Sequence, residues 1–219
     1  MVVAVWSVKG GVGVSSIAAL LAIGQVERAN NTLLVDLCGD LPALLGQDDE
    51  VERPGIVDWC AMAERDPQAL ARLEVTVRED LSFVPRGAGP LGFDARPLVE
   101  TLTTSGRLTI VDCGLLGSTT EFANDVVANT TTSLLVVREC YLNLRTLRDT
   151  ARVPTGVVVI KEPGRALGRA DIEAVAGAPV IAEVAFDSSI ARSLDSGVLR
   201  SRLPRPLVRA MGRVLQDAA

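Results

Sequence analysis

Short apolar runs alternate with longer segments of helical periodicity along most of this 219-residue chain. Residues 2–8 and 32–37 are nearly continuous in valine and leucine, a pattern typical of strands buried on both faces of a parallel sheet. Between them, residues 17–26 carry apolar side chains at helical spacing. Residues 1–37 therefore predict a strand–helix–strand unit, which we expect to cross over with the right hand.

The same alternation continues through the rest of the chain, without an internal repeat or a low-complexity linker. Further strands are predicted at residues 75–77, 81–84, 108–112, 133–137, 156–160 and 179–184. Helices are predicted at residues 56–62, 67–73, 96–103, 141–150, 171–176, 188–195 and 206–216. This order predicts one α/β domain over residues 1–219, with a mostly parallel central sheet and helices on both faces.

Composition excludes several classes of chemistry. The chain has no histidine, which excludes a Ser-His-Asp triad and histidine-based metal sites. Its four cysteines are far apart and form no CxxC pair, so we expect buried thiols rather than a metal site or disulfides. No signal peptide is expected, and no apolar run reaches the ~18 residues that a membrane span needs. A cytoplasmic protein is expected, with peripheral contact at the inner membrane left open.

The most informative stretch is residues 9–16, Lys-Gly-Gly-Val-Gly-Val-Ser-Ser, between the first strand and the first helix. Glycines let backbone approach a ligand, and the N-terminus of a helix attracts anions, so this turn predicts a phosphate site. The general phosphate-loop pattern is G-x-x-x-x-G-K-[ST], and Val14 stands where its lysine should be. A dinucleotide fingerprint is the alternative, with Gly11 and Gly13 in its first two positions and Asp36 on the ribose.

The stretch resembles the deviant phosphate loop of the MinD/ParA ATPases, K-G-G-x-G-K-[ST], and so implies a P-loop NTPase fold. In that family the first lysine, matched by Lys9, contacts the nucleotide of the partner subunit in an ATP-bridged dimer. The resemblance implies ATP and Mg²⁺ as cofactors, with Ser15 as a ligand of the metal. The loop residues it assigns to nucleotide binding are Gly10, Gly11, Val12, Gly13, Val14, Ser15 and Ser16.

Later segments extend the resemblance. Asp36 matches the first aspartate of the family's first switch, and the resemblance makes it a candidate catalytic residue together with Lys9. Cys38 stands where a second aspartate orients the attacking water. Asp40 is a candidate substitute for that aspartate, or alternatively a helix N-cap. Asp112 ends an apolar strand and matches the Walker B aspartate, a second candidate for the metal. The family often has an asparagine that reads adenine at the end of a later strand, followed by a basic residue; here Ile160 and then Lys161 stand at these positions. By this resemblance, Lys161 and Phe186 are expected to border the base.

The missing lysine and aspartate predict a degenerate member of the MinD/ParA ATPases, similar to the bacterial TadZ/CpaE-like or septum-site-determining members, with weak or no ATP hydrolysis. Such a pseudo-ATPase would act as a homodimer that positions or recruits a division, pilus, secretion or partition apparatus. The alternative is an active ATP-dependent dimerisation switch. A dinucleotide-binding protein and a metabolic ATP-dependent ligase are less well supported.

The last predicted helix is amphipathic and basic. Residues 190–219 carry six arginines against two acids, although the net charge of the chain is −5. Arg205, Arg209 and Arg213 recur every four residues beside an apolar stripe. A closing helix that packs its stripe on the domain is the first expectation. Its arginines would then face an acidic or phosphate-bearing partner, such as DNA, while insertion into a membrane is the weaker functional alternative.

Overall fold

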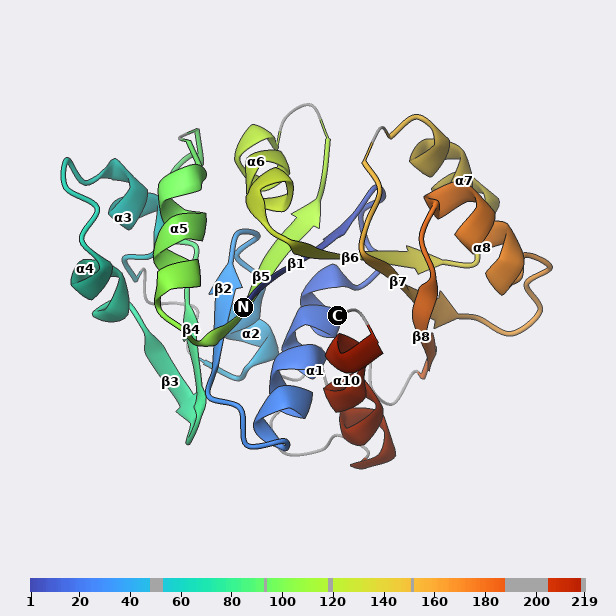
Figure 1. Ribbon diagram of the computed structural model, residues 1–219, viewed down its shortest axis with the longest axis horizontal. Coiled ribbons are helices and arrows are strands. Elements are labelled where there is room, and N and C mark those ends of the chain that lie inside the picture. Colours follow the sequence, from blue (N-terminus) through green and yellow to red (C-terminus); the bar gives the residue numbers. More distant parts are fainter. Residues whose placement is uncertain (48–52, 93, 118–119, 151, 188–204, 218–219) are drawn as a thin grey trace.

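The computed structural model describes residues 1–47, 53–92, 94–117, 120–150, 152–187 and 205–217. Its centre is an eight-stranded sheet in the order β3-β4-β2-β5-β1-β6-β7-β8, with helices on both sides (Figure 1). Every strand pair is parallel except β3 with β4, which is antiparallel. The strands are β1 (Val2–Ser7), β2 (Thr32–Asp36), β3 (Val75–Arg78), β4 (Leu81–Val84), β5 (Leu108–Leu115), β6 (Thr132–Arg138), β7 (Gly156–Lys161) and β8 (Val180–Ala185).

An apolar layer covers each face of this sheet. Strand β1 contributes to both layers, because its side chains point alternately to the two faces. Val3 and Val5 belong to one buried cluster, whereas Ala4 and Trp6 belong to the other. The first cluster packs against α1 (Val14–Val26), α2 (Leu41–Leu44) and α10 (Arg205–Asp217). The second packs against α3 (Ile56–Ala61), α4 (Pro67–Ala71), α5 (Arg96–Thr104), α6 (Glu121–Asn129), α7 (Tyr141–Arg148) and α8 (Arg169–Ala176). The predicted α/β class is confirmed.

The element boundaries agree with the sequence predictions to within a few residues, with two exceptions. Helix α6 was not predicted, although Phe122, Val126 and Val127 are buried along it. The helix predicted at residues 188–195 lies outside the described residues. Asp66 caps the start of α4, since its carboxylate accepts a hydrogen bond from the backbone N–H of Gln68 at 3.0 Å.

Helix α10 closes the domain by packing beside α1 (Figure 1). Its apolar stripe is buried, namely Val208, Met211, Val214 and Leu215. The two helices approach so closely that a Cβ atom built on Gly24 would lie 2.6 Å from the backbone nitrogen of Gly212. The expectation of a closing helix is therefore confirmed, and the apolar face that membrane insertion would need is already covered. None of the described helices is long and apolar enough to span a bilayer.

Candidate nucleotide site

A cleft of about 1160 Å³ opens at the carboxyl ends of the central strands, where ligands of open α/β sheets bind. The phosphate loop, residues 9–16, forms its floor between β1 and α1. Gly11 and Gly13 have φ of 72° and 98°, in the left-handed region where other residues are strained. A Cβ built on either would meet no atom within 4 Å, so both glycines border open space. The loop therefore has the conformation and the open side that a phosphate group needs.

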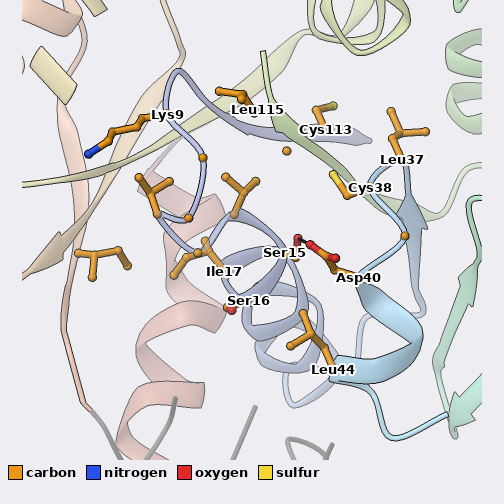
Figure 2. A pocket seen from close by; sticks show the side chains of 18 of the residues that line it. Lys9, Ser15, Ser16, Ile17, Leu37, Cys38, Asp40, Leu44, Cys113 and Leu115 are labelled. Atoms are coloured by element: carbon orange, nitrogen blue, oxygen red, sulfur yellow. Dashed lines mark hydrogen bonds between the residues drawn. The ribbon is translucent and has the colours of Figure 1, made fainter. Parts of the chain in front are cut away.

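The loop departs from that pattern at Val14, whose side chain is only 7% exposed. It belongs to the apolar cluster between α1 and the sheet, although it also borders the cleft. The charge expected at this position is thus replaced by an apolar contact. Lys9 does not take its place, because its side chain extends away from Ser15 and Asp40 (Figure 2). It makes no ion pair with any residue that the structure describes.

The turn after β2 comes against the phosphate loop; we call residues 36–41 the switch turn. Asp40 reaches the loop, and its Oδ2 accepts a hydrogen bond from the Ser15 hydroxyl at 3.3 Å (Figure 2). Asp40 also lies at the N-cap position of α2, but its side chain caps no helix N–H. The structure thus brings Asp40 to the candidate metal ligand, and its catalytic role remains a prediction.

Asp36 has a different position, buried beneath the switch turn with no exposed surface. Its carboxylate accepts hydrogen bonds from the backbone N–H groups of Cys38, Gly39 and Leu41 at 2.8, 2.7 and 3.1 Å. Burial raises the pKa of Asp36, and these three bonds oppose that shift. The contacts hold the turn in shape and leave no exposed carboxylate for a ribose, which argues against the dinucleotide alternative. The catalytic role predicted for Asp36 stays a prediction.

Asp112 lies beside Asp36 on the neighbouring strand β5 and is likewise fully buried. Its Oδ1 accepts from the backbone N–H of Gly114 at 3.1 Å and faces the Cys38 thiol at 3.6 Å. Its Oδ2 has no hydrogen-bond partner among the described residues. Burial, reinforced by the charge of Asp36, raises its pKa to about 7, while the nearby Ser15 hydroxyl opposes this shift.

A buried carboxylate oxygen without a partner, next to a hydroxyl, is what a hard divalent cation would use. The ligand atoms of Asp36, Cys38 and Asp112 lie within 4.8 Å of one another. Mg²⁺ prefers oxygen to sulfur, so Ser15 and Asp112 fit the ion and the Cys38 thiol does not. Burial also raises the pKa of this thiol well above its ordinary value, so that it remains protonated.

The far end of the cleft, expected to hold the base, lies at the ends of β6, β7 and β8. Phe186 lines this end, 45% exposed, and the Arg138 guanidinium lies 5.5 Å from the centre of its ring; the role of Phe186 at the base stays a prediction. Lys161 is not among the lining residues, contrary to expectation. Its Nζ lies 3.4 Å from the Glu139 carboxylate and 3.3 Å from the Glu183 carboxylate, which accounts for its charge. The neighbouring Ile160 borders the cleft instead.

Comparisons with known proteins agree with this geometry. The family model described as "Cellulose biosynthesis protein BcsQ" matches residues 1–108, and no curated protein sequence matches the chain. Three similar solved structures cover 98% of this chain. MinD in the MinC:MinD complex of Aquifex aeolicus has 19% identity and a TM-score of 0.77 over 95% of its length. The ParA family ATPase of Chlorobium tepidum has the same identity and TM-score over 97%. The septum site-determining protein MinD of Pyrococcus horikoshii has 18% identity and a TM-score of 0.77 over 95%.

The fold of the chain is therefore that of the MinD and ParA ATPases, and its first 108 residues match the BcsQ model. Against the MinD/ParA sequence pattern, its phosphate loop lacks one lysine and a thiol, that of Cys38, stands in place of a carboxylate. Two cleft residues were missed by the sequence analysis, Arg86 after β4 and Arg138 at the end of β6. An arginine after a strand carries no distinctive signal, and only the order of the strands brings these two to the edge where the phosphate loop lies.

Proposed function

We propose that this chain is a MinD/ParA-type protein that binds a nucleotide and Mg²⁺ in the cleft, hydrolyses the nucleotide weakly or not at all, and serves as a dimeric scaffold. The scaffold would position or recruit a cellular apparatus. The observation that carries the proposal is the contact of the Cys38 thiol with Asp112, at 3.6 Å. In the proposed scheme, a carboxylate at position 38 would orient the attacking water. The Cys38 thiol stands there instead, and it cannot accept a proton at neutral pH.

Val14 supports the same conclusion independently. A phosphate-loop lysine is a fixed positive charge aimed at the phosphoryl group in transfer, and such preorganised charges supply much of phosphoryl-transfer catalysis. Removing one comparable donor costs about 10²- to 10³-fold in turnover. The buried apolar side chain of Val14 supplies no charge to that position. The two substitutions together favour the scaffold over an active ATP-dependent switch.

Nucleotide binding is supported by what the site retains. Gly11 and Gly13 have the left-handed conformation, and the Ser15 hydroxyl lies at the loop beside Asp40. Oδ2 of Asp112 has no hydrogen-bond partner among the described residues. Ser15 and Asp112 would hold Mg²⁺, which supplies charge neutralisation at the phosphates when bound. The Pyrococcus horikoshii relative is a complex with Mg-ADP. The volume of the cleft, about 1160 Å³, is ample for a nucleotide.

The homodimer is supported by the surface beside the phosphate loop. Lys9 is available there, and Leu115, Tyr141 and Leu142 expose 46%, 66% and 52% of their surface. Gly10 lies under Leu115, since a Cβ built on it would lie 4.0 Å from a methyl carbon of that leucine. Exposed apolar side chains around a lysine suit a contact with a second copy of the chain. MinD of Aquifex aeolicus assembles with MinC, and we expect a protein partner here as well.

Two measurements test this function. The first compares ATP hydrolysis by the purified protein with its MgATP binding in calorimetry. Measurable binding with turnover near background is expected, whereas robust turnover that Ser15→Ala abolishes would establish the active switch. The second is sedimentation with and without MgATP. A dimer is expected that Lys9→Ala weakens, and a monomer at all concentrations under both conditions would contradict the scaffold.

A further inference from the structure

Arg86 lies where its charge faces the cleft without an acidic partner. It follows β4, lines the cleft, and is half-buried. Within the described residues its guanidinium pairs with no carboxylate, and its one recorded side-chain hydrogen bond is to the carbonyl of Gly87 at 3.1 Å. By contrast, Arg138, the other arginine that lines the cleft, is paired with Glu162 at 2.9 Å. Of the two arginines that line the cleft, Arg86 therefore has more to gain from a bound anion.

The backbone below Arg86 is held firmly. The carbonyls of Pro85 and Arg86 accept hydrogen bonds from the N–H groups of Ile56 and Val57 at the start of α3, both at 2.9 Å. Gly55 packs so closely that a Cβ atom on it would lie 2.1 Å from the Pro85 oxygen. The turn therefore fixes where the arginine side chain begins, and only the side chain itself needs to move toward a ligand.

The side chain then passes over the switch turn. Its Cδ lies 3.8 Å from a Cβ built on Gly39, the neighbour of Asp40, and the Asp40 carboxylate contacts Ser15. Arg86 thus approaches the phosphate loop from the switch side, where the end of the phosphate chain farthest from Phe186 would lie. Three carboxylates gather near that end, Asp36, Asp40 and Asp112, so a polyanion entering it needs positive charge beyond that of one Mg²⁺.

Resting on the proposed nucleotide binding, we infer that Arg86 is a phosphate-binding residue that supplies from the switch side the positive charge that Val14 removes from the loop. A guanidinium presents several donors in a planar fork that matches phosphate oxygens, and it stays charged at any physiological pH. Because it approaches from the switch side, it acts on the terminal phosphate of a triphosphate and less on a diphosphate. It is a binding residue, and the inference gives it no step in hydrolysis.

The test is a double-mutant cycle with MgATP and MgADP as probes, measured by calorimetry on the full chain. Arg86→Gln is expected to weaken MgATP binding about ten- to a hundredfold and MgADP binding much less. Arg86→Lys should retain part of the affinity. In a Val14→Lys background the loss from Arg86→Gln should shrink, since the loop then has its own charge. Arg72→Gln is the control, an exposed arginine whose nearest carboxylate is 3.9 Å away.

Unfolding curves of each variant separate binding from structure. If Arg86→Gln keeps wild-type affinity for MgATP, the inference is overturned while the proposed function stands. The inference also fails if both nucleotides lose affinity equally and the melting temperature falls, because Arg86 then only supports the switch turn. A wild type that binds neither nucleotide at millimolar concentration overturns the proposed function, and the inference with it.

Discussion

The Sγ atom of Cys38 lies 3.6 Å from Oδ1 of Asp112 and 3.7 Å from the Asp112 carbonyl oxygen, so the switch turn and β5 touch directly. Gly114 makes this contact possible, because a Cβ there would lie 2.4 Å from the same sulfur. Its φ of 60° also favours glycine. The thiol, the glycine and the carboxylate form one packed unit, which holds the switch turn against β5 with a thiol at position 38.

The raised pKa of Asp112 predicts a stability that depends on pH. Its pKa of about 7 lies above the ordinary value of 3.8 that it has in the unfolded chain. The folded protein therefore binds the extra proton between these values, and the stability contributed is fully present below pH ~4 and lost as pH rises through ~7. In metal-free buffer the unfolding free energy of the wild type should fall relative to Asp112→Asn by roughly 1.4 kcal/mol per pH unit in this window. Asp40→Asn, an exposed carboxylate nearby, is the control, and parallel pH profiles for wild type and Asp112→Asn would contradict the assignment.

Restoring the two lost charges should restore turnover. Val14→Lys returns a cation to the phosphate loop and Cys38→Asp returns a carboxylate to the switch turn, so the double variant should hydrolyse MgATP about a hundredfold faster than the wild type. The matched control is Val14→Met with Cys38→Ser, which changes the same sites without adding charge. Phosphate release is measured after circular dichroism has verified folding. Equal rates in the double variant and its control would show that hydrolysis fails for another reason.

The sequence predicted the site residues whose position follows from the order of the strands, and it did not predict contacts that depend on the register between strands. Ser15 and Asp112 follow directly from β1 and β5, which are neighbours in the sheet, so strand order alone brings them together. Lys161 was predicted to border the base. Its ammonium forms an ion pair with Glu139, which follows the neighbouring strand β6. No local pattern announces such a pairing, since it depends on register between strands.

Other differences come from reading one pattern at a time. The segment that became α6 has Phe122, Val126 and Val127 at helical spacing, a signal that the pass along the chain missed. The antiparallel pairing of β3 with β4 was not predicted either, because apolar periodicity does not distinguish a hairpin through the two residues between Val75–Arg78 and Leu81–Val84. Arg86 was not predicted as a site residue, because only the fold brings its side chain to Gly39 in the switch turn, which is distant in sequence.

The close crossing of α1 and α10 predicts that Gly24 cannot carry a side chain. A Cβ on Gly24 would lie 2.6 Å from the Gly212 nitrogen and 2.8 Å from the Val208 oxygen, and backbone atoms cannot rotate away. Gly24→Ala should therefore destabilise the protein by about 1–3 kcal/mol, despite the better helix propensity of alanine. Denaturant unfolding measures the change, and Ala210→Gly on the exposed side of α10 measures propensity alone. A stabilised Gly24→Ala variant would show that the helices can separate at little cost.

Arg205, Arg209 and Arg213 are exposed on α10, and the apolar stripe of the same helix is buried against α1. Changing all three to glutamine should therefore leave the unfolding free energy within about 0.5 kcal/mol of the wild type. If these arginines contact a phosphate-bearing partner, the wild type binds duplex DNA or anionic vesicles at low salt, and the triple variant does not. Each lost phosphate contact lowers the slope of log affinity against log salt by about 0.9. The control removes the same charge elsewhere through Arg72→Gln, Arg145→Gln and Arg148→Gln. If the wild type binds neither surface at low salt, α10 has a structural role only, because its apolar face is already buried against α1.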